Sequence, residues 1–275
     1  MIEPGSSSAA STPSPAPAAS GGRRNARVTA VTSGKGGVGK TFVAANLAAA
    51  LARRGERVLV LDADLGLANL DVVLNLAART TLHDVFTGRA SLEQAMQPAP
   101  GGFTVLLAGS GLIEYSRMTP EVREKLLGLI EQVRPQFDQV LLDTGAGISD
   151  VVLFTISLAD EVLVVATPEP TSLADAYATV KVLAGTQAAR PMRLLVNQTQ
   201  RPGEGRGVCQ QLQTVVDRFV NPLREQPVQL SCMGEIPLDI AVRESVQRRE
   251  LLLVSQPGSA AAVALAQVAG KLVTP

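Results

Sequence analysis

The chain has 275 residues and a formal net charge of zero, with 25 basic and 25 acidic side chains. A neutral chain has little long-range attraction for nucleic acid or an anionic membrane, so binding to either needs a local basic patch. Trp is absent and only 3% of the residues are aromatic, which argues against a surface on which bases stack.

Residues 1–26 are rich in Ser, Ala, Pro and Gly and contain almost no large apolar side chain. Such a segment does not bury enough surface to offset its ordering entropy, so the composition predicts a disordered tail. Two roles stay open for it: a solubilising linker, or a docking segment that ends in Arg23, Arg24 and Arg27. Residues 27–275 show no second domain boundary and are expected to form one domain.

From residue 28 onward, short apolar runs alternate with longer helical patterns. This alternation predicts an α/β fold, with a mainly parallel, twisted sheet and helices on both faces. Such sheets bind ligands beyond the carboxyl ends of their strands. The predicted strands are Val28–Thr32, Val58–Leu61, Phe103–Leu107, Gln139–Leu142, Val162–Ala166, Arg193–Val196 and Val228–Met233. The predicted helices are Thr41–Arg53, Pro120–Val133, Ser172–Leu183 and Gly207–Val220.

A phosphate-binding loop follows the first predicted strand directly. The residues from Ser33 to Thr41 satisfy the pattern G-x-x-x-x-G-K-[ST] and open the first predicted helix. Glycines let consecutive backbone N–H groups surround a phosphate, and the helix N-terminus favours an anion. Lys40 is expected to contact the β- and γ-phosphates, and the Thr41 hydroxyl to ligate Mg²⁺. The expected nucleotide-binding residues here are Gly34, Lys35, Gly36, Gly37, Val38, Gly39, Lys40 and Thr41.

Carboxylates follow two further strands. Asp62 and Asp64 come after the second predicted strand, where both can face a metal–phosphate site. A turn in which these residues satisfy backbone N–H groups would explain the same spacing. Asp143 ends the strand Gln139–Leu142, which is the position of a carboxylate that contacts Mg²⁺ through water. Buried strands that end in Asp are common, but the presence of Thr41 in the same chain favours the metal site.

The motif Lys35-Gly-Gly-Val-Gly-Lys-Thr41 resembles the deviant Walker A motif of the MinD/ParA ATPases. In that family the early lysine reaches the partner's nucleotide across a dimer. For Lys35 the resemblance implies that ATP is held between two subunits of a homodimer. Phe42 departs from the family, in which a small polar residue often follows the threonine.

The segment Asp62–Asp71 is similar to the switch I segment of MinD-like proteins. The resemblance implies that Asp64 orients the attacking water and that Asp62 supports Mg²⁺ indirectly. Asn69 and Asp71 would lie around the dimer interface. The implied catalytic residues are Asp64, Lys35 and Lys40, and the implied metal-site residues are Thr41, Asp62 and Asp143. Gly145 stands where many relatives have proline, which predicts a more mobile switch II loop.

A base site is expected at two later segments. Asn197, at the end of Arg193–Val196, fits an amide that reads the adenine edge, although asparagine at a strand end is more often a turn former. The segment Met233–Asp239 resembles the family's I-P-x-D segment, which adds Pro237 and Asp239. ATP is favoured over GTP mainly on this resemblance, since no N-K-x-D guanine motif occurs.

Four other features have predicted roles. Ser172 and Asp175 have the spacing of a capping box, and the resemblance adds that partner proteins dock near this helix. The segment 259–275 is apolar but carries only Lys271, so we expect a final helix packed on the domain and at most weak or transient membrane contact. His83 is expected to be a surface or packing residue. The two cysteines, Cys209 and Cys232, form no C-x-x-C pair, which argues against a disulfide framework or a zinc site. They also lie well past the switch II position, unlike the cysteines of the related iron–sulfur reductases, so a bridging cluster is not expected.

Cysteine usage favours a reducing compartment, and the longest apolar runs, such as Val162–Ala166, are far too short to cross a bilayer. The N-terminus also lacks the order of a secretory signal. We therefore expect a cytoplasmic protein, with polar placement or peripheral contact with the inner membrane as a further expectation.

Within the family, Leu61–Asp71, the loop Asp143–Ile148 and Glu169–Tyr177 look most like the flagellar number regulators of the FlhG/FleN type. This resemblance implies an ATPase that dimerises on ATP, hydrolyses it as a switch and regulates flagellar number or placement. The flagellar GTPase FlhF and a flagellar transcription activator are the implied partners, although the tail lacks the D-Q-A motif through which some members stimulate that GTPase.

The alternative is a ParA-like ATPase that positions a chromosome, plasmid or cargo and binds DNA non-specifically. Two local basic clusters would serve it, Arg243 with Arg248 and Arg249, and Arg218 with Arg224. DNA binding is the less expected function because the chain as a whole is neutral.

Overall fold

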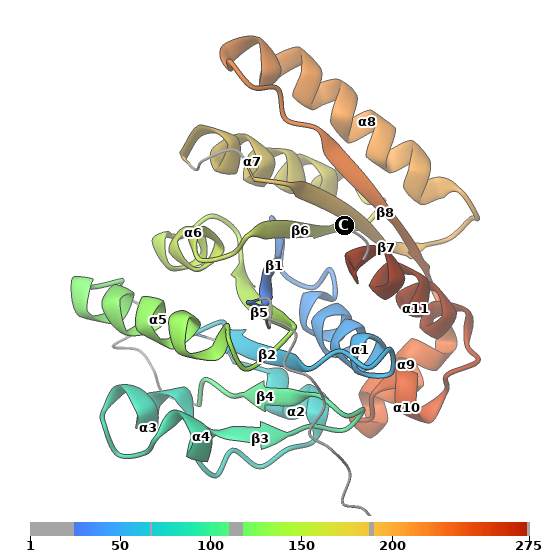
Figure 1. Ribbon diagram of the computed structural model, residues 1–275. Helices are drawn as coiled ribbons and strands as arrows, with labels where there is room; N and C mark the ends of the chain where they lie inside the picture. The colour runs from blue at the N-terminus through green and yellow to red at the C-terminus, as the bar shows by residue number, and fades with distance from the viewer. Residues whose placement is uncertain (1–24, 67, 110–117, 187–189, 274–275) are drawn as a thin grey trace, which may run out of the picture.

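The computed structural model describes residues 25–66, 68–109, 118–186 and 190–273. Eight strands form one sheet in the order β3-β4-β2-β5-β1-β6-β7-β8 (Figure 1). Neighbouring strands are parallel except for the pair β3 and β4. The strands are β1 (Arg27–Ser33), β2 (Val58–Ala63), β3 (Met96–Pro98), β4 (Thr104–Leu106), β5 (Gln139–Ala146), β6 (Glu161–Ala166), β7 (Met192–Thr199) and β8 (Leu230–Pro237).

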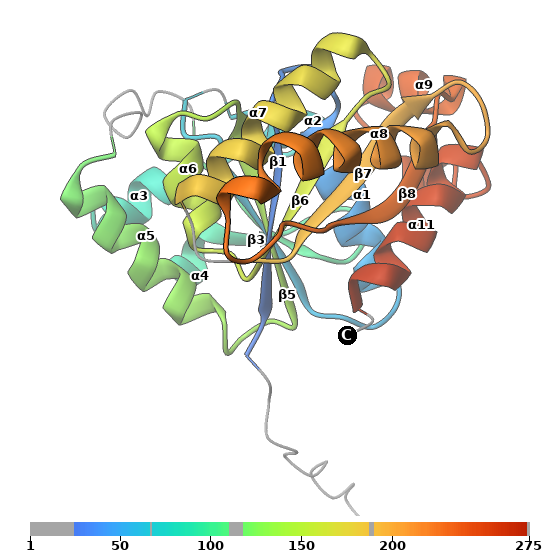
Figure 2. The ribbon, with the colours of Figure 1, turned by 90° about the horizontal axis from the view of Figure 1, so that it is seen from above.

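Helices cover both faces of this sheet (Figures 1 and 2). On one face lie α1 (Lys40–Ala52), α2 (Leu70–Leu74), α9 (Ile240–Arg248), α10 (Leu252–Ser255) and α11 (Ala260–Val273). On the other lie α3 (Leu82–Phe86), α4 (Leu92–Ala95), α5 (Pro120–Val133), α6 (Asp150–Ser157), α7 (Pro170–Thr186) and α8 (Glu204–Phe219). A short 3₁₀ turn, η2 (Asn221–Leu223), follows α8. The predicted fold class is confirmed.

The sequences of the strands are continuous apolar runs because both faces of the sheet are buried. In β6, Val162 and Val164 pack into the cluster under α5 to α8, whereas Leu163 and Val165 pack into the cluster under α1 and α11. All four side chains are at most 1% exposed.

Each predicted strand and helix is present, with ends shifted by a few residues. The largest shifts are in β5, which ends at Ala146 instead of Leu142, and in β8, which ends at Pro237 instead of Met233. One strand was not predicted from the sequence: β3, a three-residue edge strand that pairs antiparallel with β4. Most of the predicted N-terminal tail lies outside the described residues; Ala26 is already buried, at 1% exposure.

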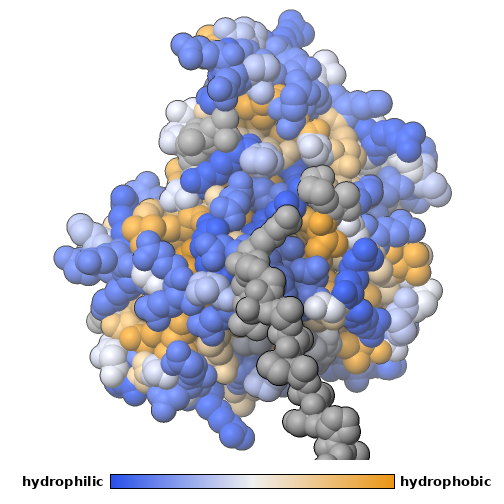
Figure 3. Space-filling view, in the orientation of Figure 1, coloured by the Kyte–Doolittle hydropathy of each residue, from blue (hydrophilic) through white to orange (hydrophobic). Residues whose placement is uncertain are grey.

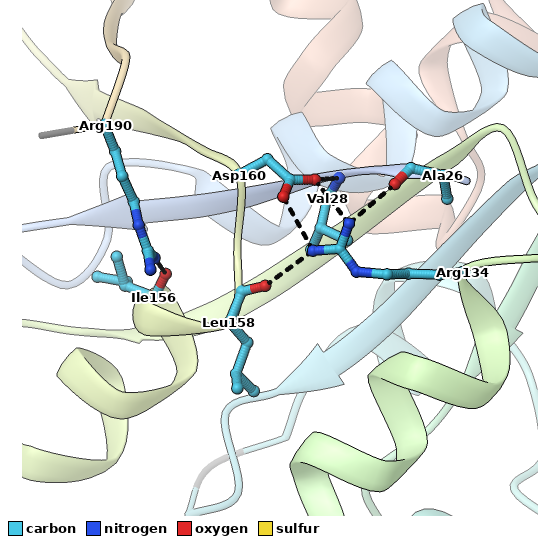
Figure 4. A network of polar contacts seen from close by, with 7 residues as sticks. All are labelled: Ala26, Val28, Arg134, Ile156, Leu158, Asp160 and Arg190. Atoms are coloured by element: carbon cyan, nitrogen blue, oxygen red, sulfur yellow. Dashed lines mark hydrogen bonds and ion pairs between the residues drawn. The ribbon is translucent and has the colours of Figure 1, made fainter. Parts of the chain in front are cut away.

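Polar contacts hold the beginning of β1 (Figure 4). The Asp160 carboxylate accepts a hydrogen bond from the Val28 N–H at 2.8 Å. The Arg134 guanidinium pairs with Asp160 at 2.9 Å and also donates to the carbonyls of Ala26 and Leu158. These contacts fix the end of the sheet opposite to the phosphate-binding loop.

The expected capping box at α7 is wrong. The helix begins at Pro170, so Ser172 lies inside the first turn, where its Oγ accepts a hydrogen bond from the Thr167 N–H at 3.0 Å. The backbone of Asp175 instead lies against Gly34, where any Cβ would collide with it. Glycine at position 34 therefore lets α7 approach the phosphate-binding loop.

The expectation against a disulfide is also wrong, and cysteine usage therefore no longer supports a reducing compartment. Cys209 on α8 and Cys232 on β8 form a disulfide, with Cα atoms 6.0 Å apart. The pairing follows from α8 packing along β8, a long-range contact that the spacing of the two cysteines does not reveal.

The final helix, α11, packs against α1 and β8, as expected for a helix of the domain core. Its C-terminal carbonyls are also bonded: Arg27 donates to Leu272 O at 2.9 Å and Arg193 to Lys271 O at 3.0 Å. Both contacts place a cation at the negative end of the helix dipole. Its buried residues are Ala261, Ala262, Leu265, Val268, Ala269 and Leu272.

Among the residues described, the structure contains no helix with the length and apolarity that a membrane span requires. Apolar surface on the face shown in Figure 3 occurs as separate patches between hydrophilic side chains.

Candidate nucleotide-binding site

The loop between β1 and α1 has the geometry of a phosphate cradle. Gly37 and Gly39 have positive φ angles of 81° and 91°, a conformation that glycine adopts without strain. Gly39 is the N-cap of α1, and no side chain caps this helix end. The free backbone N–H groups of the first turn therefore face the loop, where they favour an anion.

Asn197 holds this loop from β7. Its Nδ2 donates a hydrogen bond to Val38 O at 2.8 Å, and its Oδ1 accepts one from the Gln198 N–H at 3.0 Å. A Cβ on Gly39 would lie 2.6 Å from the same Nδ2, so the close approach requires glycine there. The amide thus links the end of β7 to the phosphate-binding loop, a contact that the sequence did not indicate. Its predicted part in reading adenine stays a prediction.

A cavity of about 520 Å³ opens in front of the loop. It brings together residues that lie far apart in the sequence, since Lys40 and Thr41 line it with Asp64 and Asn69 from the segment after β2 and with Gly145 from the loop after β5. The predicted phosphate, switch I and switch II segments therefore meet at one place. Asp71 lies in the first turn of α2 and is not among the residues that line the cavity.

Behind this cavity, Asp62 and Asp143 are direct neighbours on the parallel strands β2 and β5. They are 1% and 2% exposed, and one oxygen of each, Asp62 Oδ2 and Asp143 Oδ1, has no hydrogen-bond partner. Burial raises the pKa of Asp62 well above its usual range, and Asp143 adds to the shift. Burial also raises the pKa of Asp143 to about 7, although a hydrogen bond with Thr41 and the charge of Lys40 oppose the shift.

Buried carboxylates with an oxygen that lacks a hydrogen-bond partner need a cation or a proton. Lys40 supplies one positive charge. Burial lowers the pKa of Lys40, and the charges of Asp143 and Asp64 partly oppose this shift. The described residues contain no group of three or more His, Cys, Asp or Glu side chains that could hold a metal by themselves. This donor set suits Mg²⁺, which keeps several waters and is held by one or two carboxylates plus substrate phosphates.

On this geometry Thr41 and Asp143 would hold Mg²⁺, with Asp62 beside Asp143. Bound Mg²⁺ neutralises charge that develops on the phosphates during phosphoryl transfer. Lys40 would bind the phosphates, and Asp64, on the wall of the cavity, would orient a water. These individual roles remain predictions.

The switch II loop is fastened to the phosphate-binding loop. The Gly147 N–H donates to Ser33 O at 2.8 Å, and the Thr144 hydroxyl donates to Val31 O at 3.1 Å. A Cβ on Gly145 would lie 3.4 Å from Asp64 Oδ1 and 3.3 Å from Val152, so a larger residue would crowd the switch I carboxylate. The two predicted switch segments therefore lie close together at this point.

Lys35 lies on the outer side of the phosphate-binding loop. Its Nζ contacts Glu169 Oε2 at 3.0 Å and Thr171 Oγ1 at 3.1 Å, both at the start of α7. The ion pair is exposed, with side-chain exposures of 41% and 61%, and such pairs contribute about 0–1 kcal/mol. Lys35 is thus held weakly. Replacing Glu169 by a more highly charged partner of Lys35 would cost little free energy.

A second cavity of about 300 Å³ adjoins the first. It is lined by the predicted base-site residues Asn197, Pro237 and Asp239, and it shares Gly39 and Phe42 with the phosphate cavity. Phe42 therefore belongs to the site. The sequence contained a clue to this, because an aromatic residue directly after Thr41 is unusual for the family.

Parallel strands, a glycine loop that opens a helix, and buried carboxylates beside it define a P-loop nucleoside triphosphatase. A family model described as "ParA: NUBPL iron-transfer P-loop NTPase" matches residues 24–273. The chain belongs to the ParA/MinD family of P-loop ATPases, and it uses ATP and Mg²⁺.

Two curated relatives match nearly the whole chain. The antiactivator FleN of Pseudomonas aeruginosa is 42% identical over 246 residues, which cover 90% of this chain and 86% of FleN. The flagellum site-determining protein YlxH of Helicobacter pylori is 31% identical over 252 residues, covering 91% and 83%.

Two solved structures share the fold. The septum site-determining protein MinD of Pyrococcus horikoshii, complexed with Mg-ADP, has a TM-score of 0.74 and 27% identity, covering 90% of this chain and 96% of that chain. MinD in the MinC:MinD complex of Aquifex aeolicus has a TM-score of 0.72 and 28% identity, covering 90% and 95%.

Proposed function

We propose that this ATPase regulates the number or placement of flagella. The match to FleN carries the proposal, because it extends over 90% of the chain at 42% identity and so includes the surfaces as well as the nucleotide site. YlxH, whose name also refers to flagella, supports it. The name antiactivator given to FleN indicates a transcription activator as one partner, and the flagellar GTPase FlhF is the second partner we propose.

The switch consists of an ATP-bound homodimer and a monomer without ATP. Lys35 supports this scheme because it lies outside its own phosphate site on an exposed ion pair with Glu169. The negatively charged phosphates of a partner's ATP would compete well for this lysine. Hydrolysis would remove the γ-phosphate, release the switch loops and separate the subunits.

The protein would act in the cytoplasm, at a cell pole or at the inner membrane. Contact with the membrane is weak or transient in this proposal, since α11 buries its apolar face in the domain instead of presenting it to lipid. DNA is not a proposed partner, because the chain is neutral overall.

The proposal is tested by a clean deletion strain in which flagella are counted by electron microscopy and nucleoids are stained in the same cells. Extra or misplaced flagella with normal nucleoids are expected. The wild-type gene should restore the count, and a Lys40→Gln variant, which lacks the phosphate-binding charge, should not.

Normal flagella with missing or misplaced nucleoids would overturn the proposal. This result would favour the ParA-like alternative, a positioning ATPase that binds DNA non-specifically. Three exposed arginines on α9 or directly after it would then be the first residues to mutate: Arg243, Arg248 and Arg249.

A further inference from the structure

Phe42 stands at the only junction between the two cavities of the nucleotide site, as far as the described residues show. It follows Thr41 in the first turn of α1 and is 9% exposed. Gly39 and Phe42 are the two residues that line both the phosphate cavity and the second cavity. Gly39 has no side chain, so the ring of Phe42 is the side-chain wall at this junction.

Two polar side chains of the second cavity, Asn197 and Asp239, already have partners inside the protein. Both polar atoms of the Asn197 amide are bonded, to Val38 O and to the Gln198 N–H. Asp239 accepts hydrogen bonds from the Ala241 N–H at 2.9 Å and the Ala261 N–H at 3.1 Å, which fix the starts of α9 and α11. A base that bonds to Asn197 or Asp239 would have to share or displace these contacts.

The rest of the lining consists of the polar side chains of Gln198 and Arg243 and an apolar wall. Pro237, Leu238, Val242 and Val246 line the cavity with Phe42. Leu238 is 67% exposed and Val246 is 52% exposed, so a ligand that covers them removes apolar surface from water. A planar, weakly polar ring system suits this wall better than a charged or strongly hydrated group.

We infer that Phe42 contacts the nucleoside part of the nucleotide and strengthens its binding. With the phosphates in the cradle of the loop, the sugar passes the junction, and the purine ring enters the second cavity. The faces of the base then contact the ring of Phe42 and the apolar wall. The inference rests on the nucleotide site and is independent of the flagellar role.

The test compares two ligands of the full chain by calorimetric titration with Mg²⁺ present: ATP and inorganic tripolyphosphate, which lacks the sugar and base. A Phe42→Leu variant should bind ATP about three- to tenfold more weakly, as expected for the loss of an aromatic contact, and should bind tripolyphosphate within about twofold of wild type. GTP binding should fall in the same proportion as ATP binding, because the π-face is common to both purines.

Equal losses for ATP and tripolyphosphate would overturn the inference, since Phe42 would then act through the phosphate loop. Unchanged ATP affinity would overturn it as well. A Leu238→Ser variant, changed at an exposed position on the same wall, should show the same ligand pattern and covers the case in which Phe42→Leu does not fold. Val263→Ala, on exposed surface of α11, is the matched control and should change neither affinity.

Discussion

Asp143 is a buried carboxylate with an oxygen that has no hydrogen-bond partner, and this combination makes the protein without ligand sensitive to pH. Its pKa is raised to about 7, above that of an unfolded Asp, mainly by burial. The folded state therefore keeps its proton to higher pH than the unfolded state does. The stability linked to this proton is fully present below about pH 4 and is lost as the pH rises toward 7.

We predict that Asp143→Asn, in the absence of Mg²⁺ and nucleotide, is more stable than wild type at pH 8. The difference should be on the order of a few kcal/mol in the free energy of unfolding and should shrink toward pH 5. Thermal or urea unfolding at several pH values measures it. A difference that stays constant with pH would show that titration of Asp143 is not its cause.

Lys35 and Asp64 should have opposite effects on assembly if the proposed switch is correct. Lys35→Ala removes the charge proposed to reach the partner's nucleotide, so ATP should no longer produce a dimer. Asp64→Ala removes the carboxylate proposed to orient water, so the ATP dimer should persist. Size-exclusion chromatography with ATP measures both, and identical profiles for the two variants would contradict the scheme. Arg89→Ala, in an exposed ion pair with Asp84, is a neutral control.

At the level of secondary-structure elements, the beginning of β1 depends on Asp160. Asp160→Ala would leave the Val28 N–H without its acceptor and Arg134 without its ion pair. We expect a loss of about 1–3 kcal/mol in the free energy of unfolding, because an N–H buried without a partner loses its hydrogen bond to water. Arg134→Met should cost less, because that pair is partly exposed and Asp160 keeps its bond to β1. A larger effect for Arg134→Met in urea unfolding would contradict this order.

The disulfide between α8 and β8 should also stabilise the folded state. It closes a loop between residues 23 positions apart, for which chain entropy predicts about 3 kcal/mol. A dithiol reductant should lower the melting temperature of wild type but not that of Cys232→Ser. Mass spectrometry under non-reducing conditions confirms the bond, and a wild-type melting temperature unaffected by the reductant would contradict its stabilising role.

The same elements show what the sequence alone predicts. Strands such as β6 were predictable because both of their faces are buried, which leaves an uninterrupted apolar run. The phosphate-binding loop was predictable because its glycines, lysine and threonine are consecutive. The disulfide, the bond from Asn197 to Val38 and the place of Ser172 inside α7 were not, because each depends on contacts between elements distant in the sequence. The three-residue strand β3 is too short for a periodic signal.

The last helix, α11, is part of the domain core. Deleting residues 260–275 would expose one face of α1 and of β8, which α11 covers with six buried residues. Each buried Leu or Val contributes about 1.5–3 kcal/mol, so the loss is comparable with the total stability of a typical domain. We predict that the truncated protein does not fold, as judged by circular dichroism and yield of soluble protein.

A detachable membrane helix would behave differently, since its removal would leave a folded, nucleotide-binding domain. Deleting residues 1–24, which the sequence predicts to be disordered, is the matched control and should leave the melting temperature unchanged. A stable domain without residues 260–275 would mean that α11 is dispensable for the core.

The bond from the Arg27 guanidinium to the Leu272 carbonyl, 2.9 Å long, brings the first strand and the last helix together. The two ends of the domain are therefore close enough for a short peptide to join them. A circularly permuted gene could connect residue 273 to residue 25 and begin in the exposed turn at Gly55 instead. The strand, loop and helix of the phosphate cradle would then lie in the last part of the polypeptide, with their spatial neighbours unchanged.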